Sequence, residues 1–178
     1  MDFLHKSLSL SSITNLLSRR RMLLGAGVLA ATAAEVPLAQ AQDVPSNLKF
    51  SNPEGMFKPA GYTHVVETTG PGRTVYIAGQ LGWDASGKRA GEPGDFTAQA
   101  TQVFENLKAA LRSVGAGFEH VVKLNMFMTS IADLPKLRDV RNKYITGTPP
   151  ASTALEISKL ARPDALLEVE AIAVVAMK

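Results

Sequence analysis

The clearest pattern of hydrophobic and polar positions along the chain lies between residues 95 and 115. Its apolar residues recur at helical spacing and so share one face of an α-helix: Phe96, Ala100, Val103, Phe104, Leu107, Leu111 and Val114. Asp95 stands where an N-cap is expected, and Gly115 stands where a helix commonly stops. We therefore predict an amphipathic helix between these two residues, packed on a hydrophobic core.

Shorter patterns predict the remaining elements. Apolar residues at helical spacing indicate a short second helix, and alternation indicates strands at 62–69, 74–79, 121–129, 152–158 and 166–176. The second helix is expected at 133–145. The turn residues Gly70, Pro71 and Gly72 predict that the first two strands form a hairpin. This order of elements predicts an α+β domain in which two helices cover one face of a mixed sheet.

The last predicted strand has two different faces. One is entirely apolar and is expected to lie on the helices; it consists of Leu167, Val169, Ala171, Ala173 and Val175. The opposite face carries Glu168 and Glu170. This face becomes apolar again just past Glu170, and a carboxylate at that border is either a salt-bridge partner or an acid/base group of a functional site. Since no helix remains to cover this face, we expect a second subunit to cover it, which places Glu170 near an interface.

Two arginines interrupt the buried face of the predicted short helix. Arg141 falls inside the apolar arc between Leu137 and Ile145, and Arg138 falls at its edge. An unpaired buried charge is costly, so each guanidinium either extends out to solvent or meets an anion. That anion would be the carboxylate of Glu170 or a group of a bound ligand.

The N-terminal segment has the layout of an export signal. Three arginines at 19–21 precede a short apolar stretch at 22–34, and Ala39-Gln40-Ala41 resembles a cleavage site. The stretch is short for a bilayer span, and the adjacent arginines resemble a twin-arginine signal. We predict a signal at 1–41, an extended arm at 42–60, a domain at 61–178, and a periplasmic location without stable membrane insertion. A membrane-anchored or interfacial helix is the alternative.

Composition and charge narrow the function classes. The chain has 178 residues, 46% of them hydrophobic, and no cysteine, which excludes disulfides and thiolate metal sites. Residues 1–41 hold four of the 19 Lys and Arg and two of the 16 Asp and Glu, so the remainder carries 15 against 14. This balance gives nucleic-acid binding little electrostatic support. His64 and His120 stand without acids at ligand spacing, so no metal and no cofactor is expected.

Several motifs resemble those of a known family. They are Gly61-Tyr62, Ile77-Ala78-Gly79-Gln80, Ala98-Gln99-Ala100 with Asn106-Leu107, the segment 150–156 (PASTALE) and the segment 167–173 (LEVEAIA). Together they resemble the RidA (YjgF-type) proteins, which are reactive enamine/imine deaminases, from about Phe50 to Met177. The resemblance implies a chorismate-mutase-like fold and a homotrimer, with ligand clefts between subunits and the sheets facing the threefold core.

The resemblance assigns roles to several positions. Glu170 matches the glutamate that holds the attacking water, and Tyr62 matches a tyrosine of the cleft. Gly79 and Ala154 match positions whose backbone amides contact the ligand. The implied activity is hydrolysis of small enamines or imines to carbonyl compounds and ammonia, with a small imine, enamine or 2-oxo acid as partner.

This sequence departs from the deaminase pattern at two side chains. Ser152 stands where the deaminases have the arginine that grips the substrate carboxylate, and Ala78 replaces a serine. A serine hydroxyl binds a carboxylate less strongly than a guanidinium that donates two parallel hydrogen bonds to it. We hypothesise that Arg138, which matches an asparagine of the cleft, replaces the missing cation. The alternatives are a non-catalytic trimer that binds a metabolite or partner protein in the same clefts and, disfavoured by charge, an RNA-cleaving protein.

Overall fold

The computed structural model describes residues 44–177, so the predicted export signal at 1–41 lies outside the described residues. The larger sheet has four strands in the order β3-β6-β4-β5, with the bounds β3 Gly72–Leu81, β4 Val121–Met128, β5 Ala151–Glu156 and β6 Leu167–Ala176. β6 pairs antiparallel with both β3 and β4, whereas β4 and β5 are parallel. The sheet is therefore mixed, as predicted.

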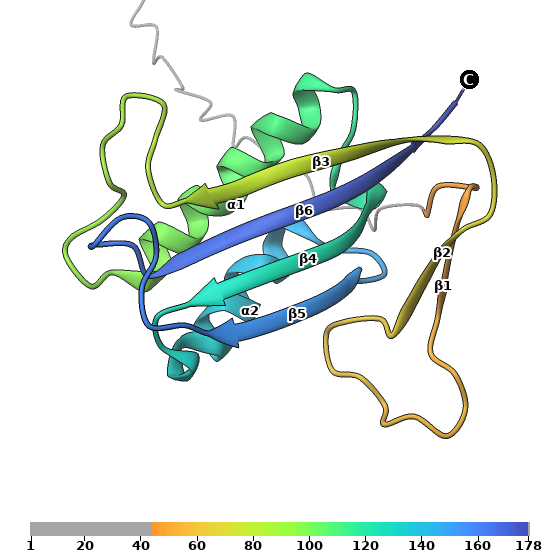
Figure 1. Ribbon diagram of the computed structural model, residues 1–178, viewed down its shortest axis with the longest axis horizontal. Coiled ribbons are helices and arrows are strands. Elements are labelled where there is room, and N and C mark those ends of the chain that lie inside the picture. Colours follow the sequence, from red (N-terminus) through yellow and green to blue (C-terminus); the bar gives the residue numbers. More distant parts are fainter. Residues whose placement is uncertain (1–43, 178) are drawn as a thin grey trace, which may run out of the picture. The chain divides into compact units, whose positions relative to one another are not determined.

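Two helices cover one face of this sheet (Figure 1). They are α1, Phe96–Ser113, and α2, Leu134–Tyr144, each near a short 3₁₀ turn: η1, Phe118–His120, and η2, Ile131–Asp133. Buried side chains of α1, α2, β4 and β6 form one continuous core, and Phe104, Leu107, Leu111, Leu124, Leu137 and Leu167 are among its largest fully buried members. Removal of this apolar surface from water is the main stabilising contribution to the layered arrangement. The predicted α+β class is confirmed.

The ends of α1 follow from local sequence. The Asp95 carboxylate accepts a hydrogen bond from the N–H of Ala98 at 3.0 Å, and Gly115 has φ +71° just beyond the last turn. The side chain thus satisfies an amide that has no partner within the helix, and the glycine adopts a conformation that other residues rarely take. Both predicted boundaries are confirmed.

The predicted hairpin of 62–69 with 74–79 is wrong. Strand β2, Val65–Thr68, pairs antiparallel with β1, Leu48–Ser51, and together they form a separate two-stranded sheet. The turn at 70–72 connects β2 to β3 but does not pair them. The reason is that β3 has a longer partner in β6, and this pairing places Val75 and Ile77 against the core. The predicted arm at 42–60 thus contains a strand.

The face of the larger sheet that carries no helix, called the open face below, displays alternate residues of each strand. Asn125 pairs with Glu170, and Ile172 pairs with both Tyr76 and Lys123. The alternation predicted for the last strand holds from Leu167 to Ala173 and ends there. Val174 is also buried, because the chain at Gly72 and Asn47 packs against it on the open side.

Candidate functional site

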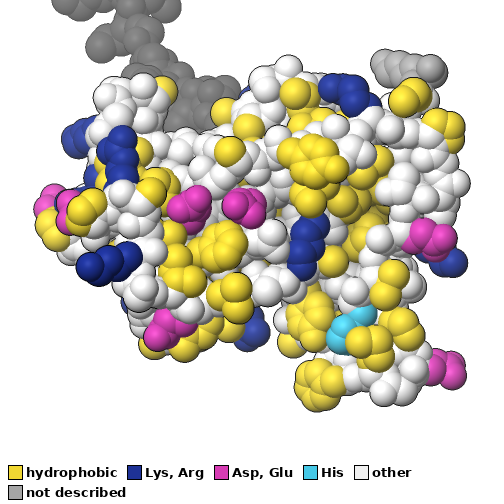
Figure 2. All heavy atoms as spheres, viewed as in Figure 1, with side chains coloured by type: hydrophobic (Ala, Val, Ile, Leu, Met, Phe, Trp, Pro, Cys, Tyr) yellow, Lys and Arg dark blue, Asp and Glu magenta, His cyan; other side chains and the backbone are white. Residues whose placement is uncertain are grey.

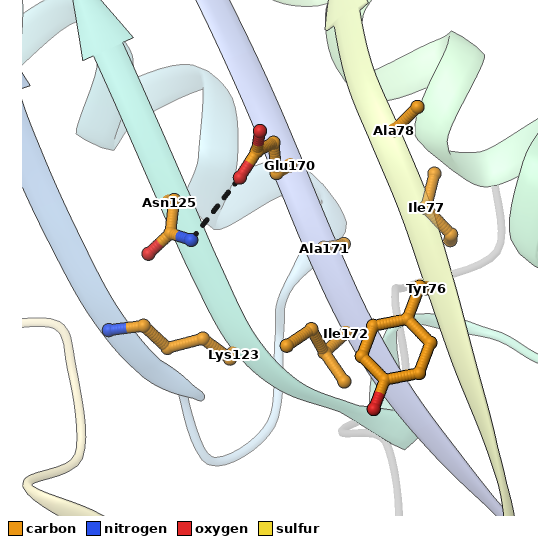
Figure 3. Close-up of a pocket in the computed structure, with 8 residues that line it drawn as sticks. All are labelled: Tyr76, Ile77, Ala78, Lys123, Asn125, Glu170, Ala171 and Ile172. Atoms are coloured by element: carbon orange, nitrogen blue, oxygen red, sulfur yellow. Dashed lines mark hydrogen bonds between the residues drawn. The ribbon is translucent and has the colours of Figure 1, made fainter.

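A hollow of about 370 Å³ lies on the open face (Figure 3). It is formed by adjacent strands and lined by Tyr76, Ile77, Ala78, Lys123, Asn125, Glu170, Ala171 and Ile172. The space-filling view from the same side shows acidic side chains next to one another among hydrophobic and uncharged ones (Figure 2). The hollow therefore combines a carboxylate with an apolar wall, which is the composition expected of a site for a small molecule.

Glu170 is half-buried, and its carboxylate faces β4. The side-chain amide of Asn125 donates to its Oε2 at 3.3 Å, as the dashed line in Figure 3 marks. The ammonium of Lys123 lines the same hollow but donates to Oγ1 of Thr153 at 2.7 Å. Within residues 44–177 Glu170 makes no ion pair, so the salt-bridge interpretation has no support in the described part of the chain.

Glu168 lies on the same face and contacts the irregular part of β3. The register of β3 against β6 shifts between Ile77 and Gln80, so Ala78 and Gly79 form a bulge. A Cβ at Gly79 would overlap the carboxylate of Glu168, so the Glu168 side chain occupies the space that this glycine leaves free. Strand alternation predicted that Glu168 lies on this face, but no sequence signal gave it a role. A glycine across from a carboxylate on the neighbouring strand is the signal that would have found it.

A second cavity, of about 150 Å³, lies on the helix side of the sheet. It is lined by Ala60, Gly61, Tyr62, Met126, Leu134, Arg138, Arg141, Ser152 and Ala154. Ser152 and Ala154 belong to this side because they pair with Leu124 and Met126, whose side chains are buried beneath the helices. The structure thus brings together Tyr62, Ser152, Ala154 and Arg138, as the resemblance implies.

The two arginines of α2 differ in burial, as their positions on the helix predict. Arg138 is exposed at the rim, whereas Arg141 is 6% exposed. The Nη2 of Arg141 donates to Oδ1 of Asn142 at 3.0 Å, and a Cβ at Gly61 would lie 2.5 Å from the same nitrogen. Burial, and then the charge of Arg138, lower the pKa of Arg141, although a guanidinium stays protonated at neutral pH.

The predicted site residues therefore fall into two groups on opposite faces of one sheet. Glu170, Ala78 and Gly79 belong to the open face, and the residues around Ser152 belong to the helix side. Within one chain, neither arginine reaches Glu170 across the sheet. The helix-side cavity borders β5, which is an edge strand of the larger sheet.

The described part of the chain offers no grouping of three or more His, Asp or Glu side chains that could hold a metal ion. His64 Nε2 lies 2.7 Å from the carbonyl oxygen of Phe57, and His120 Nδ1 lies 2.9 Å from the carboxylate of Glu119. Both histidines thus have local partners. Among residues 44–177 no helix has the length and apolar character needed to cross a membrane.

Known proteins are similar to this chain in sequence and in fold. Residues 56–175 match the family described as Endoribonuclease L-PSP. Protein DfrA of Myxococcus xanthus is 38% identical over 103 residues, covering 58% of this chain and 77% of that protein. A mouse 2-iminobutanoate/2-iminopropanoate deaminase is 34% identical over 102 residues, covering 57% and 74%.

A solved structure gives the same result. A Yersinia pestis protein of unknown function from the conserved Rid family, YyfB, is 36% identical, with a TM-score of 0.66 over 72% of this chain and 99% of that one. The motifs, the layered fold and these matches agree with one another. The chain therefore belongs to the RidA (YjgF-type) family, whose sequence family is also described as Endoribonuclease L-PSP.

Proposed function

We propose that the protein hydrolyses small reactive enamines or imines to carbonyl compounds and ammonia, in clefts between the subunits of a homotrimer. The similarity to proteins named 2-iminobutanoate/2-iminopropanoate deaminase supports the reaction class. The observation that carries the proposal is the pair of carboxylates, Glu168 and Glu170, on a sheet face without a helical cover, beside the bulge at Ala78 and Gly79.

The two groups of residues lie on opposite faces of the sheet in one chain, which supports a site shared between two chains. The open face exposes large apolar side chains, including 78% of Tyr76 and 48% of Leu155, and such a surface is better covered by another copy. A neighbouring subunit whose open face meets the β5 edge would bring its carboxylates to the cavity around Ser152. Each cleft would then have one carboxylate wall and one cationic wall, contributed by different chains.

The reaction needs little catalytic assistance from the protein because the imine carbon is already electrophilic. The carboxylate accepts a proton as the oxygen of a bound water forms a bond to that carbon, and then returns the proton to nitrogen. The hydroxyl group formed in this step then gives up its proton to the amine nitrogen, the carbon–nitrogen bond breaks, and ammonia leaves as the carbonyl group forms. The guanidinium of Arg138 would hold the anionic end of the substrate, in place of the arginine that Ser152 replaces.

The contacts favour Glu168 over Glu170 as the residue that holds the water. Glu168 lies against Gly79, where the resemblance expects a backbone amide to contact the ligand. Glu170 lies beside it and accepts a hydrogen bond from Asn125, which orients it and occupies one of its oxygens. We therefore assign to Glu168 the role of holding the water, which the resemblance gives to Glu170.

Ammonia release from freshly generated imines of several amino acids tests the proposal. We expect the wild-type protein to accelerate release over buffer, Glu168→Gln to lower kcat by about a hundredfold, and Glu170→Gln to lower it less. Glu67→Gln is the control, since Glu67 is exposed on β2 and pairs with Lys49. Absence of acceleration by the wild type, with measurable binding of a 2-oxo acid, would instead identify a non-catalytic binder.

A further inference from the structure

The helix-side cavity contains a cation with no counter-charge among the described residues. The Nε of Arg141 is buried and has no hydrogen-bond partner there, and its Nη2 donates to the neutral side-chain amide of Asn142. Within residues 44–177 no Asp or Glu forms an ion pair with either Arg141 or Arg138. A buried charge without a partner costs several kcal/mol relative to one that is paired. The missing charge must therefore come from outside the chain, either from an anionic ligand or from the carboxylates that a neighbouring subunit would bring to this cavity.

The walls that one chain contributes to the cavity carry two positive charges and no negative one. Arg138 and Arg141 lie one helical turn apart on α2, close enough for the charge of Arg138 to disfavour protonation of Arg141. The other polar lining groups are the hydroxyls of Tyr62 and Ser152, and that of Ser152 donates to the carbonyl oxygen of Pro150 at 3.1 Å. A single carboxylate would neutralise one of the two guanidinium groups and leave the other unpaired.

The size and apolar surface of the cavity limit what enters. The volume that one chain encloses is about 150 Å³, which is enough for a short-chain acid. Met126, Leu134 and Ala154 supply apolar surface for the carbon chain. A short chain with an acidic group at each end matches both the charge and the volume.

We propose that the ligand of this cavity is a small dicarboxylic acid, with one carboxylate held by Arg138 and the other by Arg141. Its identity as a 2-imino dicarboxylic acid, or the 2-oxo product, rests on the proposed function. Binding of a dianion at the paired guanidiniums does not require the reaction. Arg141 is therefore a specificity-determining residue, and it is absent from the positions that the family resemblance assigns.

Calorimetric titration with two matched ligands tests this inference. 2-Oxoglutarate and 2-oxopentanoate share a five-carbon 2-oxo acid skeleton and differ by the terminal carboxylate. We expect 2-oxoglutarate to bind wild-type protein at least about tenfold more tightly at low salt, the usual effect of one charge-assisted contact. Equal affinities would overturn the proposal, and so would inorganic phosphate that binds as tightly as 2-oxoglutarate.

Substitution of Arg141 adds a readout that a structural role would not produce. We expect Arg141→Met to abolish the preference for 2-oxoglutarate and to leave 2-oxopentanoate binding intact. The ligand-free variant should unfold at a denaturant concentration no lower than wild type, because the unpaired buried charge is gone. Lys143→Met on the exposed side of α2 is the control. Destabilisation with an unchanged preference would mean that Arg141 is structural and would overturn the inference.

The variant Arg141→Lys and an assay of ammonia release distinguish the remaining outcomes. If the methionine variant does not fold, Arg141→Lys, which keeps the charge but loses the planar fork, should retain part of the preference. A full preference in this variant would contradict the geometry. Wild-type protein that prefers 2-oxoglutarate but releases no ammonia from any imine would refute the proposed reaction alone. Imine hydrolysis without any dicarboxylate preference would refute the dicarboxylate site alone.

Discussion

Gly61 shows how one residue links backbone conformation to the cationic cavity. It has φ +83°, and its missing side chain leaves room for the guanidinium of Arg141. A left-handed conformation costs a non-glycine residue about 1–2 kcal/mol. At Gly61 a methyl group would add a steric conflict with a buried cation, so the position demands glycine for two separate reasons.

Gly61→Ala should therefore destabilise the protein more than a change that strains the backbone alone. Gly55 offers the matched control, because it has φ +84° and a methyl group there would meet no atom within 4 Å. We expect the free energy of unfolding to fall further in Gly61→Ala than in Gly55→Ala by about 1 kcal/mol or more, the usual cost of overpacking. Denaturant titration measures both variants, and equal losses would mean that Arg141 moves aside freely.

At the scale of elements, α1 and α2 are joined through Tyr144. Its ring stacks on Phe104 with centroids 5.3 Å apart, and its hydroxyl donates to the Glu105 carboxylate at 2.8 Å. Burial, together with the hydrogen bond and charge of Glu105, raises the pKa of Tyr144 to about 12. The folded protein therefore retains the phenol proton at a pH at which the unfolded chain, with a pKa near 10.0, begins to lose it.

The sign of the resulting pH dependence follows from this difference. Between pH 10 and 12 the folded state binds more protons than the unfolded state, so the free energy of unfolding falls as pH rises through this range. The contribution of Tyr144 is complete below pH 10. We expect Tyr144→Phe to be less stable than wild type at pH 8 and to lose less stability between pH 9 and 11. Urea titrations at these pH values measure the difference, and parallel declines would contradict it.

Local sequence signals predicted an element correctly where the element depends only on residues that are neighbours along the chain. The apolar positions of α1, its Asp95 cap and the stop at Gly115 depend only on neighbours along the chain. Six of the seven apolar positions are buried within the helix, and the seventh, Val114, is its half-buried C-cap. The turn at 70–72 was also recognised, but a turn does not determine which strands pair. β3 finds in β6 a partner nearly a hundred residues away, and no local pattern encodes that choice.

At the scale of the whole molecule, the motifs assigned residues to a cleft but did not relate their positions within one chain. Motif positions identified Glu170 and Ser152 as parts of one cleft, whereas the sheet places them on opposite faces. Strand alternation could assign a face to each residue, yet the parallel pairing of β4 with β5 was needed to relate the two. The sequence also left open whether the two arginines extend to solvent or meet an anion. The burial of Arg141 excludes the first of these alternatives for that residue.

A site shared between copies makes a prediction about mixed oligomers. Glu168→Gln removes a group of the open face and Arg138→Ala removes a group of the helix-side cavity, so each variant alone should have low activity. If each cleft combines one face from each of two neighbouring chains, co-refolding the variants in equal amounts creates clefts in which both groups are intact. Random assembly makes these about a quarter of all clefts, since each required chain is present in half of the positions.

We therefore expect the mixture to regain about a quarter of the wild-type rate of ammonia release, well above the average of the two variants. Native mass spectrometry of the same sample verifies that the oligomers are mixed and counts their subunits. As a control, Glu168→Gln mixed with Glu168→Gln/Arg138→Ala should regain nothing, because no chain in that mixture keeps the open-face carboxylate. Mixed oligomers without recovery would contradict a cleft shared between two chains. They would mean that both groups act within one chain, although the sheet places these groups on opposite faces.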